Sequence, residues 1–209
     1  MIEKSERWMK RVRNLTGFLG MILPWIVLLS SIIYANIEGV PDGFWKELSI
    51  SETYYIAPVL AGILTTASVI LMCYDGYDWR DNLITSLAGI FGLFIVIFPC
   101  NCPMAPERVG IFQLPAAISD IIHTASALTF FVLLAINSCF LFTLGDSDTK
   151  NKRIRKVIYR ICGIGMVASA SLFLVPSLEA KLFIIEAIAL TFFGISWLVK
   201  GRVFGFLED

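Results

Sequence analysis

Long apolar segments alternate with short polar segments along the whole of this chain. Six apolar runs stand out, and they cover residues 15–35, 56–74, 83–99, 118–144, 157–175 and 182–199. An α-helix needs about 20 predominantly apolar residues to cross roughly 30 Å of hydrocarbon, and each run is close to that length. The pattern therefore predicts six transmembrane helices.

These runs are apolar on every face of the segment, as residues 89–98 and 128–136 illustrate. A strand of a transmembrane barrel would instead alternate apolar and polar side chains with a period of two. Only helices and closed barrels satisfy their backbone hydrogen bonds in lipid. We therefore predict an all-α polytopic membrane protein with its six helices in a compact bundle. Of the 209 residues, 57% are hydrophobic and 16% charged, whereas soluble domains have about 25% charged residues.

The basic residues divide unequally between the two sides that six spans define. Fourteen of the 17 lysines and arginines lie in or next to the two terminal segments and the loops after the second and fourth spans. Cytoplasmic loops are enriched in these residues, so both termini are predicted to be cytoplasmic. We expect a basic tail at residues 1–14, a transmembrane domain at 15–199 and a second tail at 200–209. The expected location is a bacterial inner membrane, with the first helix as an uncleaved anchor.

Three acidic or imidazole side chains interrupt the apolar runs: Asp120, His123 and Glu186. Asp120 and His123 are three residues apart and share one helical face, and Glu186 lies at a similar outer-leaflet depth. A carboxylate in hydrocarbon costs at least about 2.5–3.5 kcal/mol, so such groups pair inside the bundle or mark a functional site. We expect the three to meet in one polar pocket that opens outward. A structural hydrogen bond between helices and snorkelling to the interface are the alternatives.

The predicted inner loop after the second span carries three carboxylates, those of Asp75, Asp78 and Asp81. Asp78 and Asp81 precede the third span, where acidic groups complement the helix dipole and Asp81 is a candidate cap. The alternative is an inner-face site for a cation or a basic partner. Capping and turn formation are favoured, because these effects operate at any helix start.

A metal site has little support. Cys100 and Cys102, with Met104 and His123, are soft or borderline ligands, but a single CxC is not the paired spacing of structural zinc. With one histidine in the chain, a three-histidine zinc site is excluded. Two interfacial thiols are the simpler interpretation. We predict no metal and no cofactor.

Two further patterns concern packing. Trp45, Leu48 and Ile50 fall in the first predicted outer loop, residues 36–53, either as a short re-entrant or interfacial piece or within a plain connection. The plain connection is favoured, because the pattern is short and has no clear period. In the third and fifth spans, small residues such as Gly89 and Gly163 predict close approach of helix backbones.

Several fragments resemble a known class of membrane protein. They are Tyr74-x-Gly76-Tyr77-Asp78-x-x-Asp81, Phe98-Pro99, His123-x-x-Ser126-Ala127, Glu186, and Phe193-Gly194-x-Ser196-Trp197-x-x-Lys200-Gly201. Together they resemble small, uncharacterised six-span bacterial integral membrane proteins that are grouped as domains of unknown function. Spans three and four are also loosely similar to the Frag/DRAM-like six-span group. Both resemblances imply a six-helix bundle and special roles for His123 and Glu186, and neither implies a substrate.

The expected function is binding. An apolar pocket with a few convergent polar groups suits a lipid, a small amphiphile or a membrane partner. We expect membrane lipid as a partner, together with a second copy of the chain or another membrane protein. Zero net charge argues against nucleic acid. The alternatives are a proton-linked transporter or oligomeric channel, and an intramembrane lipid hydrolase using Asp120 with His123 or Glu186. An enzyme is not favoured, because no recognised catalytic motif is present.

Overall fold

A computed structural model describes residues 2–40, 48–144, 149–175 and 178–205. The six α-helices in this part of the chain are α1 (Ile2–Glu38), α2 (Val59–Met72), α3 (Trp79–Ile97), α4 (Ala116–Ile136), α5 (Lys150–Ala168) and α6 (Lys181–Lys200). Shorter elements are the 3₁₀ turns η2 (Ser51–Tyr55) and η4 (Ser169–Leu174), the π-helical turn η3 (Asn137–Leu141), and a hairpin of β1 (Arg108–Val109) and β2 (Leu114–Pro115).

The prediction of a helical membrane protein is confirmed at this level. Five of the described helices are long and apolar enough to cross a membrane. The remaining one, α2, has 14 residues. At a rise of 1.5 Å per residue it extends about 21 Å, which is shorter than the hydrocarbon core.

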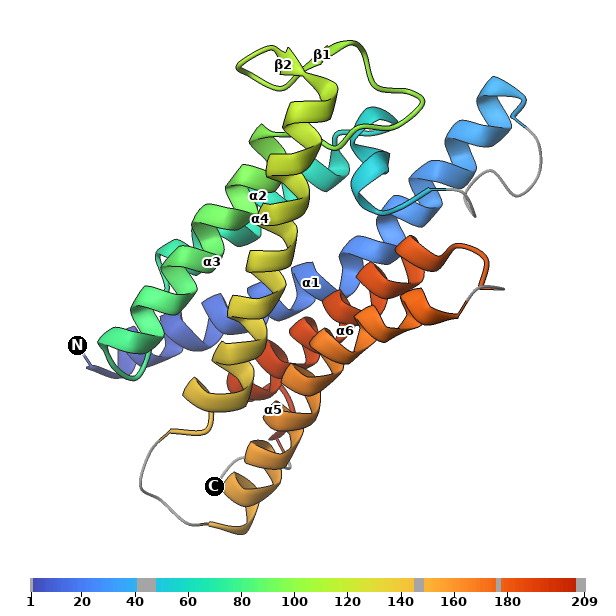
Figure 1. Ribbon diagram of the computed structural model, residues 1–209. Coiled ribbons are helices and arrows are strands. Elements are labelled where there is room, and N and C mark those ends of the chain that lie inside the picture. The colour runs from blue at the N-terminus through green and yellow to red at the C-terminus, as the bar shows by residue number, and fades with distance from the viewer. Residues whose placement is uncertain (1, 41–47, 145–148, 176–177, 206–209) are drawn as a thin grey trace.

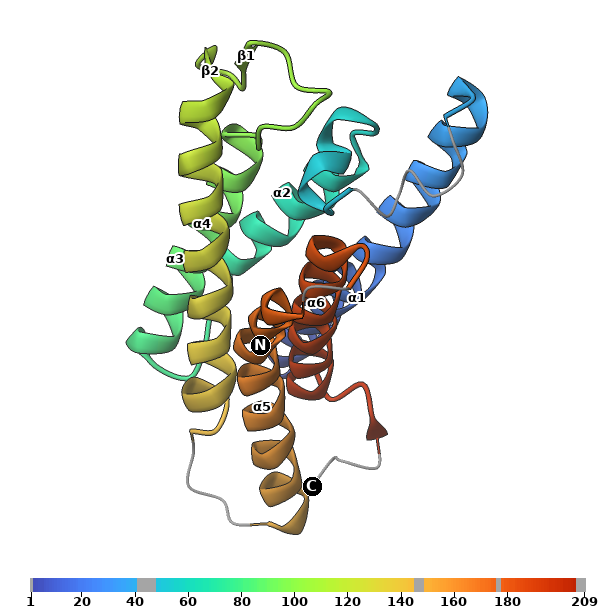
Figure 2. The same cartoon turned by 45° about the vertical axis from the view of Figure 1, so that its right-hand side comes forward.

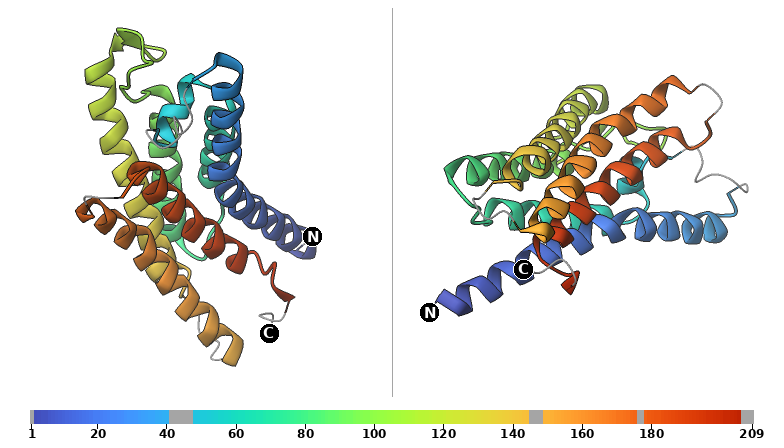
Figure 3. Two further views of the ribbon diagram at one scale, coloured as in Figure 1. Left: turned by 90° about the vertical axis from the view of Figure 1, so that its right-hand side faces the viewer. Right: turned by 90° about the horizontal axis from the view of Figure 1, so that it is seen from below.

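The helices form an antiparallel bundle with two distinct ends. In this bundle α1 packs against both α2 and α6. Helix α3 lies between α2 and α4, and α5 packs against α4 and α6. Figures 1 and 2 show the β hairpin at one end, which we call the hairpin end. The first residues of α1, α3 and α5 and the last residues of α6 lie at the other, which we call the basic end (Figure 3).

Helix α1 is longer than the predicted first span. It begins at Ile2, so helix continues through the segment expected to be a basic tail. Pro24 lies inside it, and Figure 3 shows that the helix is bent. A proline removes one backbone hydrogen bond and clashes with the preceding turn, which accounts for a bend in a continuous helix.

The core near the basic end is built from aromatic rings. The ring of Trp197 is 5.0 Å from that of Tyr74 and 5.3 Å from that of Phe142, both edge-to-face. Phe142 in turn contacts Tyr159 at 5.4 Å. This cluster packs the loop after α2 against the segment at the end of η3, α5 and α6. It therefore fixes the positions of these four segments relative to one another at the basic end.

Candidate functional site

Glu186 of α6 binds a segment that does not belong to any spanning helix. Its carboxylate accepts hydrogen bonds from the Ile50 backbone N–H at 2.6 Å and from the Ser51 hydroxyl at 3.0 Å. Leu48, Ser49 and Ile50 are buried, and the following turn, η2, is held over the bundle. This part of the segment between α1 and α2 is therefore packed into the bundle. A re-entrant or interfacial piece stays a prediction, and Trp45 lies outside the described residues.

His123 of α4 forms hydrogen bonds with the C-terminal end of α3. Its Nδ1 lies 3.1 Å from the Ile95 carbonyl oxygen and 2.9 Å from that of Phe98. Because both neighbours are acceptors, Nδ1 is assigned the proton and donates it. The last carbonyls of a helix lack partners within the helix, and the imidazole supplies one. Its Nε2 is buried and has no hydrogen-bond partner among the described residues.

Asp120 holds the loop between α3 and α4. Its carboxylate accepts a hydrogen bond from the Asn101 backbone N–H at 3.0 Å. The neighbouring Ser119 hydroxyl donates to the Pro99 carbonyl at 2.8 Å. Tyr55 of η2 approaches the same loop and donates to the Cys100 carbonyl at 2.7 Å.

The three predicted pocket residues thus lie toward the same end but have separate partners. Within the described part of the chain, no hydrogen bond joins Asp120, His123 and Glu186 to one another. Each of the three forms a hydrogen bond with a backbone group of another segment of the chain. A single site formed by all three remains a prediction.

A small cavity lies beside Glu186. It measures about 40 Å³ and lies among α1, α2, α3, α4 and α6, with Ile50 and Ser51 in its wall. Its other walls are apolar side chains, those of Leu23, Leu60, Leu64, Ile95, Ala127, Phe130, Phe131 and Leu190. Neither Asp120 nor His123 is among the lining residues. The cavity therefore presents one carboxylate at the edge of an apolar space.

The cysteines near this end are free thiols. Cys100 is buried and Cys102 is partly buried. Burial raises the pKa of both thiols; for Cys102 the backbone N–H groups of Met104 and Ala105 partly oppose the increase. Among the described residues, no three histidine, cysteine or acidic side chains gather as a metal-binding group. A metal at Cys100 and Cys102 gains no support from this geometry.

At the basic end, the cap of α3 is Asp78 and not Asp81. The Asp78 carboxylate accepts hydrogen bonds from the backbone N–H groups of Arg80 and Asp81, both at 3.0 Å. The helix begins at Trp79, two residues before Asp81, so the prediction that Asp81 caps it is wrong. Asp75 instead accepts a hydrogen bond from the Asn82 side chain at 3.1 Å.

Asp81 is fully buried against this turn. One carboxylate oxygen accepts the Tyr77 backbone N–H at 3.0 Å. The other, Oδ1, is buried with no hydrogen-bond partner among the described residues. Gly76 lies against the carboxylate, and a side chain there would collide with it. The opposite charges that act on Asp81 come from Lys200 and Arg13.

Two fragments that carry the resemblance therefore meet in space. The Tyr74–Trp197 ring contact joins the loop after α2 to the end of α6. The alternative of an inner-face site for a cation or a basic partner stays a prediction, and within the chain the charges of Lys200 and Arg13 act on Asp81. The sequence analysis did not identify Lys200 and Arg13 as the cations that act on Asp81. The one feature that could have indicated them is their position next to an apolar run.

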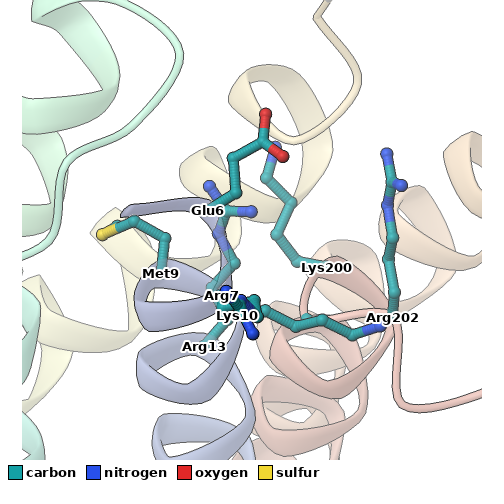
Figure 4. Close-up of a pocket in the computed structure, with 8 residues that line it drawn as sticks. Glu6, Arg7, Met9, Lys10, Arg13, Lys200 and Arg202 are labelled. Carbon is teal, nitrogen blue, oxygen red and sulfur yellow. The ribbon is translucent and has the colours of Figure 1, made fainter. Parts of the chain in front are cut away.

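A larger cavity opens beside this cluster, between α1 and the end of α6 (Figure 4). We call it the basic pocket. Its volume is about 390 Å³, and its lining residues are Glu6, Arg7, Met9, Lys10, Arg13, Lys200, Gly201 and Arg202. The Lys200 ammonium lies 4.7 Å from the centre of the Phe142 ring, and the Arg13 guanidinium 5.5 Å from that of Tyr74. Aromatic faces attract cations, so these rings stabilise charge where water is scarce.

Comparisons of this chain with protein-family models, with curated proteins and with solved structures find no match.

Proposed function

We propose that the chain is a six-span protein of a bacterial inner membrane with both termini in the cytoplasm. Five long apolar helices support this, with α2 as the additional span. Helix α2 begins after Pro58 and is preceded by η2. The basic end contains most of the lysines and arginines, which is the distribution of a cytoplasmic side.

We further propose that its activity is to bind a single-chain amphiphile in the cavity beneath residues 48–51. One observation carries this proposal: the Glu186 carboxylate borders an otherwise apolar cavity and accepts its hydrogen bonds from Ile50 and Ser51, in a segment outside the long helices. An apolar site with one directing polar group suits a ligand with a hydrocarbon tail and a hydrogen-bonding head. A head with an N–H or O–H donor can take the place of Ile50 and Ser51.

The size of the cavity decides how such a ligand enters. About 40 Å³ accommodates only one or two water molecules. Residues 48–51 must therefore move outward before a hydrocarbon tail can enter between α4 and α6. The ligand then exchanges donors at Glu186, so the carboxylate keeps its hydrogen bonds throughout, and the tail contacts Phe130 and Phe131.

Photolabelling tests this proposal. The probe is a single-chain alkyl amine with a diazirine in its tail, added to the purified full-length protein in lipid nanodiscs. We expect labelling on the cavity-lining parts of α4 and α6, and competition by the unlabelled amine. Glu186→Gln should lower the labelling about tenfold, because hydrogen bonds to a charged group contribute roughly 1.5–3 kcal/mol each.

Asp120→Asn is the matched control. It removes a carboxylate at the same end of the bundle that does not line the cavity. Its labelling should equal that of the unmodified protein. Equal labelling of the Glu186 variant, or labelling confined to residues that do not line the cavity, would show that the cavity is not the binding site.

The proton-linked transporter and the lipid hydrolase gain no comparable support. Each of these functions requires at least two of Asp120, His123 and Glu186 to act together. No hydrogen bond joins any two of them in the described part of the chain. A binding function needs only the carboxylate and the apolar walls that the structure contains.

A further inference from the structure

We infer that the basic pocket is a second binding site, for the phosphate of an anionic lipid headgroup. This site lies at the end of the bundle opposite the Glu186 cavity and is formed by different residues. It does not depend on the amphiphile binding proposed above, and it rests on the proposed orientation of the chain in the membrane.

The charge of the lining residues selects the class of ligand. Arg7, Lys10, Arg13, Lys200 and Arg202 contribute five cations, and Glu6 contributes one carboxylate. They come from two segments of the chain almost 190 residues apart, brought together by the packing of α1 on α6. Figure 4 shows the basic side chains arranged around one space. Arginine binds phosphate through two parallel N–H donors, and lysine acts as a point charge.

The pocket is a built cavity and more than an exposed basic surface. Its volume of about 390 Å³ is within the usual range of ligand sites, roughly 300–1,000 Å³. Arg13 at its floor is partly buried, and its Nε–H is a buried donor with no hydrogen-bond partner among the described residues. A phosphate oxygen is an acceptor of the kind that such a donor lacks.

Gly201 allows the two sides of the pocket to approach. A side chain at this position would collide with the Asn14 side chain of α1. Without that close approach, the cations of α1 would be separated from Lys200 and Arg202. The residue following Gly201, Arg202, has a left-handed backbone (φ 56°), which ends α6 and turns the chain.

The depth of the pocket favours a lipid over a free anion. Trp8 stands beside Arg7 on α1 and is 65% exposed, and Trp79 at the start of α3 is 68% exposed. Exposed indole rings on a membrane protein concentrate at the headgroup level. Basic pockets between transmembrane helices on the cytoplasmic side are typical sites for anionic headgroups. The basic pocket is at the level where the phosphate of a lipid resides.

Lipid titration of the purified full-length protein tests this site. Native mass spectrometry in detergent would measure the apparent dissociation constant for phosphatidylglycerol, with phosphatidylcholine as the zwitterionic comparison. We expect a clear preference for phosphatidylglycerol. Lys10→Gln combined with Arg202→Asn should weaken it about 25-fold, since each cation near the headgroups contributes roughly fivefold. Asparagine suits position 202 because it tolerates a left-handed backbone.

The control variant removes the same charge from the same end of the bundle. It carries Lys150→Gln and Lys156→Gln, two positions near the start of α5 that do not line the pocket. This variant should change the dissociation constant for phosphatidylglycerol by less than about threefold. The charge-preserving pair Lys10→Arg and Arg202→Lys should retain the affinity. Thermal unfolding of every variant separates a binding defect from a folding defect.

Inorganic phosphate distinguishes the two sources of the anion. Binding of phosphatidylglycerol that persists in millimolar phosphate supports a lipid site. Displacement by phosphate, with no preference for phosphatidylglycerol over phosphatidylcholine, would overturn it. Equal losses in the pocket variant and the α5 variant would also overturn it, because they would show attraction by net charge alone.

Discussion

Glu186 shows how this chain accommodates a carboxylate within an apolar run. A charged side chain in hydrocarbon is costly unless it has partners. The Ile50 N–H and the Ser51 hydroxyl supply them from 136 and 135 positions earlier in the chain. The sequence indicates that Glu186 needs a partner, because it stands alone among apolar residues. It does not indicate which one, because His123 and Asp120 are at a similar predicted depth and equally plausible.

A pair of double-mutant cycles separates these partners. Glu186→Ala and Ser51→Ala should show a coupling energy of about 1 kcal/mol, the size of a hydrogen bond between segments of a membrane protein. Glu186→Ala and His123→Ala should be additive within about 0.5 kcal/mol, because the two side chains bind different backbone groups. The free energy of unfolding in mixed micelles is the measurement. Strong coupling of Glu186 to His123 would instead support a shared pocket.

At the scale of elements, helix packing depends on which face each glycine occupies. Gly89 of α3 lies against Met72 and the Ser68 carbonyl of α2, with no room for a side chain. Gly62 of α2 has no heavy atom within 4 Å of the position its side chain would take. Composition treats both residues alike, and only the direction of each helix face distinguishes them. The predicted close approach at Gly89 therefore corresponds to a contact between α3 and α2. At Gly62 no neighbouring segment requires a glycine.

The two glycines make a matched pair of substitutions. Gly89→Ala should destabilise the bundle by about 1–3 kcal/mol, the usual cost of overpacking. Gly62→Ala should be neutral or stabilise it by up to about 1 kcal/mol, since alanine is the better helix former. Thermal unfolding of the two variants, followed by circular dichroism, measures the difference. Equal effects would mean that α2 and α3 are not packed at Gly89.

For the whole molecule, the proposed orientation places Cys102 outside and Cys73 inside. Cys73 is exposed beside the basic end, after α2, and Cys102 is partly buried in the loop after α3. The two thiols therefore report on opposite sides of the membrane. Cys100 is a poor reporter, because it is buried and burial raises the pKa of its thiol.

Labelling of single-cysteine variants in spheroplasts tests this orientation. A membrane-impermeant maleimide should modify the Cys102-only variant directly and the Cys73-only variant only after permeabilisation. Burial raises the pKa of Cys102, so less thiolate is present at neutral pH and the labelling rate should rise about tenfold per unit of pH. The opposite pattern of accessibility would reverse the proposed topology.

The sequence by itself determined that this is a helical membrane protein and the approximate position of several of its helices. A helix in lipid satisfies its backbone hydrogen bonds within one continuous segment, so a local apolar run is sufficient to predict it. The runs at residues 83–99 and 182–199 accordingly correspond to α3 and α6 within a few residues. The start of α2 after Pro58 follows from the same local chemistry, because proline is tolerated at the beginning of a helix.

Only the tertiary structure decided which polar groups meet. Glu186 binds Ser51, the charge of Lys200 acts on Asp81, and Arg13 shares a cavity with Arg202. Each of these pairs joins residues more than 100 positions apart, so no local pattern distinguishes the true partner from other polar groups at the same depth. The folded bundle selects the partner, because helix packing determines which side chains face each other.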